Sequence, residues 1–480
     1  MLLIGTILLP IISGIIVSTI NADMSIRKRG YTGILFLTDI LCILSILEGK
    51  GITPLVFSGN VSFSYAVDGL SAFFMIAVMI LYTCTCFYAF EYMKHEERPN
   101  VFFAFFFISY GALISVAASA NMITLYFSFE LLTLMTVPLV LHELTQQAVA
   151  AGLKYLFYSV GGALLGLLAV FFVYHFSSGD VSFVYGGFLD MEKIAGHEKL
   201  FLATVFIGII GFGTKAGMYP MHGWLPAAHP IAPAPASALL SGIVAKAGVI
   251  AIIRLVYYSV GTELIRGTWV QYTWMTLCLL TIFMGSMMAY REKILKKRLA
   301  YSTISQISYI LLGLSFLSEG GLRGGLLHLM SHMAAKGCLF MVAGIFIVQL
   351  GIRRVDDLKG IGKRMPASMW CFALASLSLV GIPPFGGFLS KWVIASAAID
   401  SGIRYYAVIA PAVLLISALL TAGYLLTTVV DGFFPGHDIH AEVLTKAEPP
   451  RIMWIPLTVL CGVSLVMGLF GPVILSSFGF

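Results

Sequence analysis

The feature that most constrains this chain is a series of apolar runs, each about 20 residues long and separated by short polar connections. A helix needs about 20 apolar residues to cross the hydrocarbon core of a bilayer, so each run predicts one membrane-spanning helix. None of the connections is long enough to form a soluble domain. We therefore expect an all-α polytopic membrane protein, one transmembrane domain over residues 1–480, with about fourteen spans, at about residues 1–20, 31–48, 66–90, 101–119, 121–141, 153–176, 200–219, 233–257, 270–290, 300–317, 324–350, 368–398, 405–430 and 453–477.

The amino-acid composition agrees with burial in lipid. Only 11% of the residues are charged, whereas a soluble domain carries about 25%. The first run has no basic segment before it and leads into Arg27, Lys28 and Arg29. We therefore expect it to be a first span and not a cleaved signal peptide.

The distribution of Lys and Arg predicts the orientation, because connections on the inner side of a membrane are enriched in them. If both termini lie outside, the connections expected inside carry 18 of the 29 basic residues and those expected outside carry 6. The net charge of +6 then reflects topology, and we expect no nucleic-acid partner. The other five basic residues fall within apolar runs: Lys215, Lys246, Arg254, Lys336 and Lys391.

Charges inside the apolar runs need a structural partner or a function, since each costs about 2.5–3.5 kcal/mol at the centre of a bilayer. Glu130 lies midway along the fifth run, and Lys215 and Lys246 lie on the seventh and eighth. One interpretation is a buried salt bridge that fixes helix packing. The other is a proton site, because moving a carboxylate toward or away from a buried lysine changes the proton affinity of the lysine.

Two aspartates also lie in or near apolar runs. Asp68, in VDGLSAFF, stands where a helix is expected to begin, so its carboxylate would cap free backbone N–H groups. Asp39 is expected to be buried and paired, with a partner that the sequence does not identify.

A polar stripe crosses the eleventh run, where His328, His332 and Lys336 follow one another at intervals of four residues. On a helix these side chains share one face, with neighbours about 6 Å apart. A metal site is disfavoured, since the lysine would repel a cation and no third ligand is evident. Two interpretations remain: histidines that hydrogen-bond neighbouring helices, and a hydrated proton wire, because histidine titrates near neutral pH.

Two runs are interrupted by glycine and proline. The seventh run carries Lys215 near its end and is followed by Pro220, and the twelfth contains Pro383 and Pro384 before Lys391. Interrupted helices in corresponding halves predict inverted repeats, here spans 4–8 and 9–13, or residues 101–257 and 270–430. Broken backbone needs polar groups or water, so each break is expected to bring water to a lysine.

The cysteines give no sign of a cofactor. All seven lie in apolar runs and none forms a CxxC pair, whereas iron–sulfur and structural zinc sites need grouped thiolates. We find no redox centre, nucleotide-binding loop or quinone-binding signature, and we expect no cofactor and no metal.

Several motifs together resemble one family, the antiporter-like membrane subunits shared by respiratory complex I, Mrp sodium/proton antiporters and membrane-bound hydrogenases. The resemblance extends over nearly the whole chain, and its motifs are VDGLSAFF, TLYFSFELLTL, KYLFYS, GTKAGMYPMHGWLPAAHPIAPAPASALLSG, LAYSTISQISY, HLMSHMAAKGCLF and GIPPFGGFLSK. It implies a central axis of polar residues along the membrane plane. In this axis Glu130 would be the switch residue, Lys215 its partner and Lys246 the connecting lysine. The relay in the eleventh run would consist of His328, His332 and Lys336, and Lys391 would be the terminal residue. Some relatives have His at Gln306, so a relay role is not implied there. The chain lacks the long lateral helix of the distal complex I subunit, which argues against that position.

The resemblance implies a proton-translocating subunit of the cell (inner) membrane that is driven by partner membrane subunits. Protons would pass from the inside through two half-channels joined by the axis. Three alternatives remain: a subunit that moves sodium, a non-transporting scaffold for redox subunits, and a solute transporter, for which we find no substrate signature. The sequence leaves open whether the assembly carries out redox chemistry.

Overall fold

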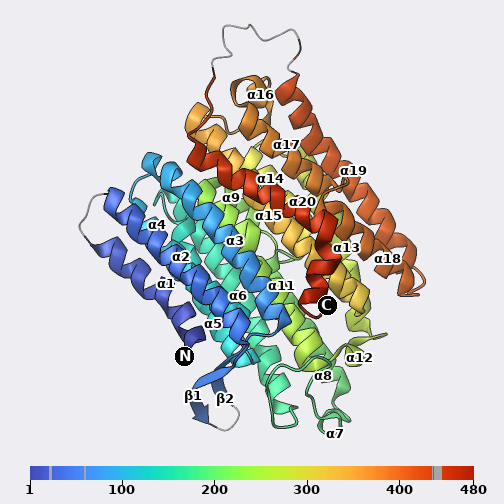
Figure 1. The fold of residues 1–480 in the computed structure, drawn as a ribbon. Coiled ribbons are helices and arrows are strands. Elements are labelled where there is room, and N and C mark those ends of the chain that lie inside the picture. The colour runs from blue at the N-terminus through green and yellow to red at the C-terminus, as the bar shows by residue number, and fades with distance from the viewer. Residues whose placement is uncertain (21–23, 59–60, 435, 437–445) are drawn as a thin grey trace. The chain divides into compact units, whose positions relative to one another are not determined.

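The computed structural model describes residues 1–20, 24–58, 61–434, 436 and 446–480, and most of them are helical (Figure 1). The elements in chain order are α1 (Leu2–Thr19), α2 (Met24–Glu48), β1 (Ile52–Ser58), β2 (Val61–Tyr65), α3 (Gly69–Tyr92), η1 (Met93–His95), α4 (Pro99–Ala118), α5 (Met122–Val140), α6 (Gln146–His175), α7 (Met191–Ile194), α8 (Glu198–Ala216), α9 (Leu225–Ile231), α10 (Ala234–Leu239), η2 (Leu240–Val244), α11 (Lys246–Ile253), η3 (Arg254–Val260), α12 (Thr262–Ile265), α13 (Trp269–Arg291), α14 (Leu295–Ser315), α15 (Glu319–Leu350), η4 (Val355–Leu358), α16 (Ile361–Arg364), α17 (Pro366–Val380), α18 (Gly386–Asp400), α19 (Tyr406–Phe433) and α20 (Arg451–Ser477).

The expected all-α membrane architecture is confirmed. Within the described residues, 12 helical segments are long and apolar enough to cross a membrane. The run expected at 300–317 is helix α14, whose first turn carries three basic residues, and the run at 368–398 is divided into α17 and α18. The number of fourteen spans therefore stays a prediction.

A β-hairpin between α2 and α3 was not expected from the sequence. Strands β1 and β2 pair in antiparallel fashion, and the hairpin is tied to the first turn of α5. The Asn121 side chain donates to the Ser62 carbonyl at 3.0 Å, and the Ser64 N–H donates to Thr124 Oγ1 at 2.9 Å. The signal was two runs rich in β-branched and aromatic residues, ITPLVFS and VSFSY, separated by two residues.

The chain forms two compact units. The first comprises Met1–Ile80, Arg98–Trp224 and Val244–Met275, and the second comprises Leu81–Glu97, Leu225–Ile243 and Thr276–Phe480. The predicted repeats, residues 101–257 and 270–430, stay predictions.

Close backbone approach in the first unit sets the positions of its lysines. A Cβ at Gly211 of α8 would lie 2.5 Å from the Gly166 nitrogen of α6, and one at Gly248 of α11 would lie 2.5 Å from the Phe212 carbonyl oxygen of α8. Small residues allow membrane helices to pack this closely. Helix α8 is therefore in direct contact with both α6 and α11 near Lys215.

The second unit is arranged around α15, which packs against α14, α17, α18 and α20. This helix is buried from Leu326 to Phe346. Its polar residues therefore face other helices of the unit and not lipid.

The break after α8 follows a glycine. Gly217 has a φ of 77°, and the Met218 N–H donates to the Gly213 carbonyl at 2.9 Å. This bonding pattern is the Schellman motif, in which a glycine in the left-handed region ends a helix. The peptide bond before Pro220, three residues after the glycine, is cis.

The break after α17 has the same local construction. Gly381 has a φ of 94°, and the Ile382 N–H donates to the Leu377 carbonyl at 3.0 Å. The peptide bond before Pro384, again three residues after the glycine, is cis. The two interrupted runs thus end their first helices in the same way.

The eighth expected run is a continuous helical stretch from Ala234 to Val260. Two of its segments are π-helical, η2 and η3. Single π turns inside helices occur frequently at functional sites. Segment η2 ends two residues before Lys246, and η3 begins at Arg254.

Candidate functional site

Lys215 lies in the last turn of α8 and is almost fully buried, with 1% of its surface exposed. Its ammonium donates to the Thr133 hydroxyl of α5 at 2.9 Å and to the Tyr155 hydroxyl of α6 at 2.7 Å. Tyr155 in turn shares a hydrogen bond of 2.7 Å with Thr136. The lysine is therefore held by neutral hydroxyl groups at the end of a broken helix.

Glu130 lies on α5, one turn before Thr133, and its charge interacts with that of Lys215. Within the described residues the two side chains form no ion pair within 4.0 Å, so the attraction acts over a longer distance. Tyr126 is the other polar group acting on the carboxylate. The geometry is that of a separated acid and base and not of a closed salt bridge.

Lys246 is the first residue of α11 and is fully buried. A Cβ at Gly248, two residues on, would lie 3.1 Å from the Lys215 Cβ. The first unit therefore brings Glu130 and Lys215 within electrostatic reach of each other and places Lys246 on the helix that packs against α8 beside Lys215.

Lys391 in the second unit lies at the other break. Its ammonium donates to the Leu379 and Val380 carbonyls, at 2.5 and 3.0 Å, which are the last carbonyls of α17. A cation is favoured there, because the carboxyl end of a helix carries partial negative charge. The ammonium also lies 5.0 Å from the ring centroid of Tyr309.

A row of rings continues from Lys391 into α15. Tyr309 stacks on His328 at 5.3 Å between ring centroids, and His328 stacks on His332 at 5.9 Å. His328 Nδ1 lies 2.9 Å from the hydroxyl oxygen of Ser390, the neighbour of Lys391 in sequence. These contacts join the predicted relay to the predicted terminal lysine.

Lys336 lies one turn beyond His332 and is fully buried. Its ammonium donates to the Leu299 carbonyl of α14 at 2.9 Å. On the same helix α14, both polar atoms of the Gln306 amide are buried and make no hydrogen bond within the described residues. Buried polar groups are normally satisfied, so Gln306 marks a place suited to water.

Four functional candidates were missed from the sequence. Tyr155 and Tyr309 were missed because a hydroxyl in an apolar run attracts no attention. His229 is fully buried in α9, and its ring stacks on that of Phe340 with 4.7 Å between the centroids. Phe340 lies on α15, one turn beyond Lys336. Its signal was a histidine between the two parts of an interrupted apolar segment.

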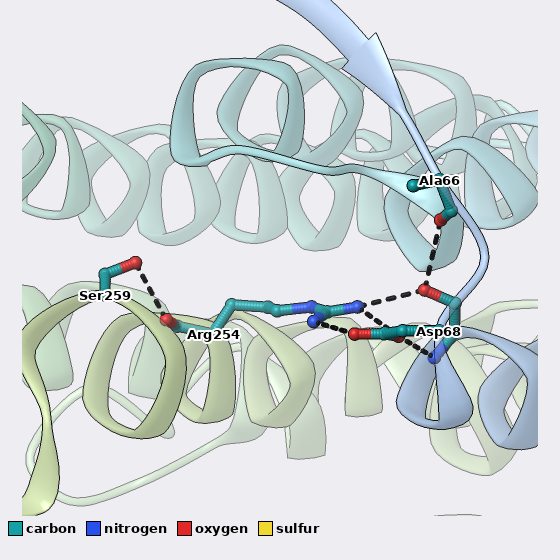
Figure 2. Close-up of polar contacts among 5 residues, drawn as sticks. Ala66, Asp68, Arg254 and Ser259 are labelled. Carbon is teal, nitrogen blue, oxygen red and sulfur yellow. Dashed lines mark hydrogen bonds and ion pairs between the residues drawn. The ribbon is translucent and has the colours of Figure 1, made fainter. Parts of the chain in front are cut away.

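The fourth is Arg254, which stands out in the sequence as a charge in an apolar run but was assigned no role there. Its side chain points at Asp68 (Figure 2). The guanidinium donates to both Asp68 oxygens, at 2.6 and 2.7 Å. Asp68 also accepts from the Ser71 N–H at 2.8 Å, as expected for a residue that caps α3. The Arg254 side chain is 3% exposed and that of Asp68 is 40% exposed, so a permanent buried charge is neutralised by an acid that reaches the surface of the unit.

Asp39 is buried, as expected, and its partner is Tyr110 of α4, whose hydroxyl donates to the carboxylate at 2.5 Å. The pair joins α2 to α4.

Metal-binding groups are not assembled in the described part of the chain, where no three His, Cys, Asp or Glu side chains are arranged to hold an ion. Three cysteines do converge, with the Cys338 and Cys461 sulfurs 3.7 Å apart beside Cys371. They are buried in helices α15, α20 and α17.

Comparison with known sequences places the chain in a family. The transmembrane family described as NADH:quinone oxidoreductase/Mrp antiporter matches residues 119–421, and the N-terminal family of chain 5 of NADH-ubiquinone oxidoreductase (complex I) matches residues 56–103. NADH-quinone oxidoreductase subunit N of Desulforudis audaxviator is 32% identical over 85% of this chain and 81% of its own length. A Na(+)/H(+) antiporter subunit of Alkalihalophilus pseudofirmus is 31% identical over 76% of this chain, which spans about half (48%) of that relative.

The fold agrees with these relationships. A chain of the membrane-bound sulfane sulfur reductase, an archaeal respiratory membrane complex, superimposes with a TM-score of 0.85 at 22% identity, and the match covers 99% of this chain and 96% of that one. The match of the transmembrane family to residues 119–421 includes every predicted polar residue from Glu130 to Lys391. The chain belongs to the NADH:quinone oxidoreductase/Mrp antiporter family of multi-pass membrane proteins.

Proposed function

We propose that this chain is a proton-translocating, antiporter-like subunit of a membrane assembly related to complex I. The observation that carries the proposal is the pairing of each broken helix with a lysine in an apolar segment, the buried Lys215 at the first break and the half-buried Lys391 at the second. Neutral oxygen atoms accept hydrogen bonds from both ammonium groups, and the same oxygens can accept from a neutral amine, although more weakly. Each lysine therefore keeps its place whether or not it carries the proton.

The proposed path has one half in each unit. In the first, protons from the inside reach Lys215 at the break, with Glu130 as the switch and Lys246 as the connection. In the second, His332 and His328 relay them past Tyr309 to Lys391 at the other break. Support comes from the stacked rings and from the buried Lys336 and Gln306, which provide polar surface along the relay.

Glu130 would control the proton affinity of Lys215 through the distance between the two side chains. Because it is separated from Lys215, movement toward the lysine strengthens the attraction and favours the protonated amine, and movement away releases the proton. Partner subunits would drive this movement. The relatives are named as subunits of larger systems, and we infer that this chain likewise assembles with other membrane subunits in the cell membrane, with both termini outside.

The test replaces Glu130 by alanine in the assembled complex, in sealed membrane vesicles. Proton translocation should fall to the level of vesicles without the complex, while the amount of assembled complex stays normal. Glu198→Ala is the matched control, since Glu198 lies exposed at the start of α8. Full translocation by the Glu130 variant would contradict the switch.

Sodium is the second candidate ion, because one relative is named as a Na(+)/H(+) antiporter subunit. Sodium prefers several oxygen ligands, whereas the residues of the predicted axis are mostly lysine and histidine, which favours protons. Translocation that persists without sodium supports the proton, and strict dependence on sodium supports the alternative. A scaffold without transport predicts that substitutions at Glu130 and Lys215 leave ion coupling intact.

A further inference from the structure

A pocket in the first unit opens beside the β-hairpin. Its volume is about 330 Å³, and its walls come from the hairpin, from residues 119–120 between α4 and α5, and from residues 182–183. The walls are joined by backbone pairing, since the Ala66 N–H donates to the Ala118 carbonyl at 2.8 Å and the Phe183 N–H donates to the Ala120 carbonyl at 2.9 Å. The pocket is thus a built feature and not a gap between loose segments.

The lining of this pocket suits water. Hydroxyl groups line it on several sides, from Thr53, Ser64, Ser119 and Ser182. A cavity needs polar partners to hold water, and one molecule takes up about 30 Å³ in the liquid. The pocket therefore has both the room and the polar groups for several water molecules.

Arg254 and Asp68 both line the pocket, and Figure 2 shows the contacts between them. The guanidinium is fixed on all sides, because it also donates to the Ser71 hydroxyl at 2.9 Å and lies 4.8 and 4.6 Å from the rings of Phe183 and Tyr258. The titratable and charged groups around Asp68 are Arg254 and Tyr258 of η3, with Tyr185 behind Tyr258.

The same helical stretch connects this pair to the proposed proton path. Lys246 begins α11 and Arg254 follows that eight-residue helix directly, at the start of η3. At about 1.5 Å per residue, the two backbone positions are about 12 Å apart along the axis. Arg254, which lines the water-suited pocket, thus lies about two helical turns along the same stretch from the buried Lys246.

We propose that this pocket is an aqueous port of the first unit, through which Lys246 exchanges protons with the solution on the hairpin side. The Asp68–Arg254 pair sets the charge at the inner end of the port. The inference rests on the proposed function, because it requires a proton on Lys246. It goes beyond it, because the first unit would have an opening of its own in addition to the path through the second unit.

The pair has to stay neutral for protons to pass. If Asp68 loses its charge, Arg254 becomes an unbalanced positive charge on the helical stretch that carries Lys246, where the two backbone positions are about 12 Å apart along the axis. At an effective dielectric constant of about 20, repulsion between two unit charges about 12 Å apart lowers the proton affinity of the lysine on the order of tenfold.

The first experiment blocks the port. In the assembled complex in sealed vesicles, Ser64→Cys and, separately, Ser182→Cys are treated from the hairpin side with a cationic, membrane-impermeant methanethiosulfonate. Proton translocation by each variant should fall at least about tenfold from its own untreated rate and return after reduction with dithiothreitol. Glu192→Cys, exposed on α7 outside the pocket, is the matched control and should keep its rate.

Two results would contradict the proposal that this pocket is an aqueous port. One is complete labelling, shown by mass spectrometry, with an unchanged rate. The other is failure of the reagent to reach either cysteine. A failure of the proposed function itself is distinguishable from a failure of the port. If the function is wrong, Lys215→Ala keeps proton translocation, whether or not labelling of the cysteines changes the rate.

The second experiment tests the charge at the inner end. Asp68→Asn should lower the translocation rate per assembled complex on the order of tenfold, and Asp68→Asn combined with Arg254→Gln should restore it to within about threefold. Glu263→Gln, which removes the exposed ion pair with Arg266, should have no effect. If the pair only holds helices together, Asp68→Asn will lower the amount of assembled complex and the double variant will restore it. The translocation rate per complex will then be the same in both variants.

Discussion

At the scale of single residues, the two break lysines are held by acceptors of different kinds. Lys215 is held by two hydroxyl groups and Lys391 by two backbone carbonyls. Neither partner set carries a full negative charge, so neither locks the lysine in its protonated form. A direct carboxylate partner would do so.

Tyr155 provides one of these acceptors and tests their importance. Tyr155→Phe removes a hydrogen bond to a charged group, worth about 1.5–3 kcal/mol, and translocation should fall roughly tenfold or more. Tyr158→Phe, on the same helix, is the matched control, since the hydroxyls that accept from Lys215 are those of Thr133 and Tyr155. Equal rates for the two variants, measured as proton uptake per complex, would argue against a role for the Tyr155 hydroxyl.

The sequence predicts the charged residues of the site better than their partners. Lys215 and Lys391 stand out because a charge in an apolar run is costly. The hydroxyls of Thr133 and Tyr155 cost little to place in a span, so nothing marks them before helix packing brings them to the lysine. Arg254 was noticed as a charge, but its partner Asp68 lies 186 residues away and only the fold joins them.

At the scale of elements, both helix breaks follow from glycine in a left-handed conformation. The sequence predicts the breaks, because proline and glycine interrupt apolar runs at these two places. It does not predict that Lys391 caps the carbonyls of α17, because that depends on how α18 returns after the break. The β-hairpin was missed because its two short runs look like an ordinary connection between spans.

Gly381 makes the link between break and lysine testable. An added Cβ would lie 3.0 Å from the Lys391 Cδ, whereas one at Gly402, also at positive φ, would meet nothing within 4 Å. Alanine at either position costs about 1–2 kcal/mol of backbone strain. Only Gly381→Ala should also displace the lysine and lower translocation, while Gly402→Ala should keep it.

The comparison is made as translocation per assembled complex, with thermal stability measured in parallel. Equal losses of stability with unequal transport support the account. Equal transport by the two variants would show that the break does not position Lys391.

At the scale of the whole molecule, the distribution of basic residues predicts the orientation. If both termini lie outside, a cysteine at Glu192 should react with an impermeant thiol reagent in intact cells. A cysteine at Arg354, exposed between α15 and α17, should react only after the membrane is permeabilised. The opposite pattern would reverse the proposed direction of proton movement.

The division into two units, each with its own break, agrees with one half-path per unit, and the central claim is that the break lysines carry protons. The most direct measurement is proton translocation by the assembled complex in sealed vesicles with Lys215→Ala. Lys199→Ala is the control, since Lys199 lies exposed on the same helix α8. The account predicts that the Lys215 variant assembles normally and translocates no protons above background, while the Lys199 variant matches the unmodified chain. Translocation at the normal rate by the Lys215 variant would contradict it.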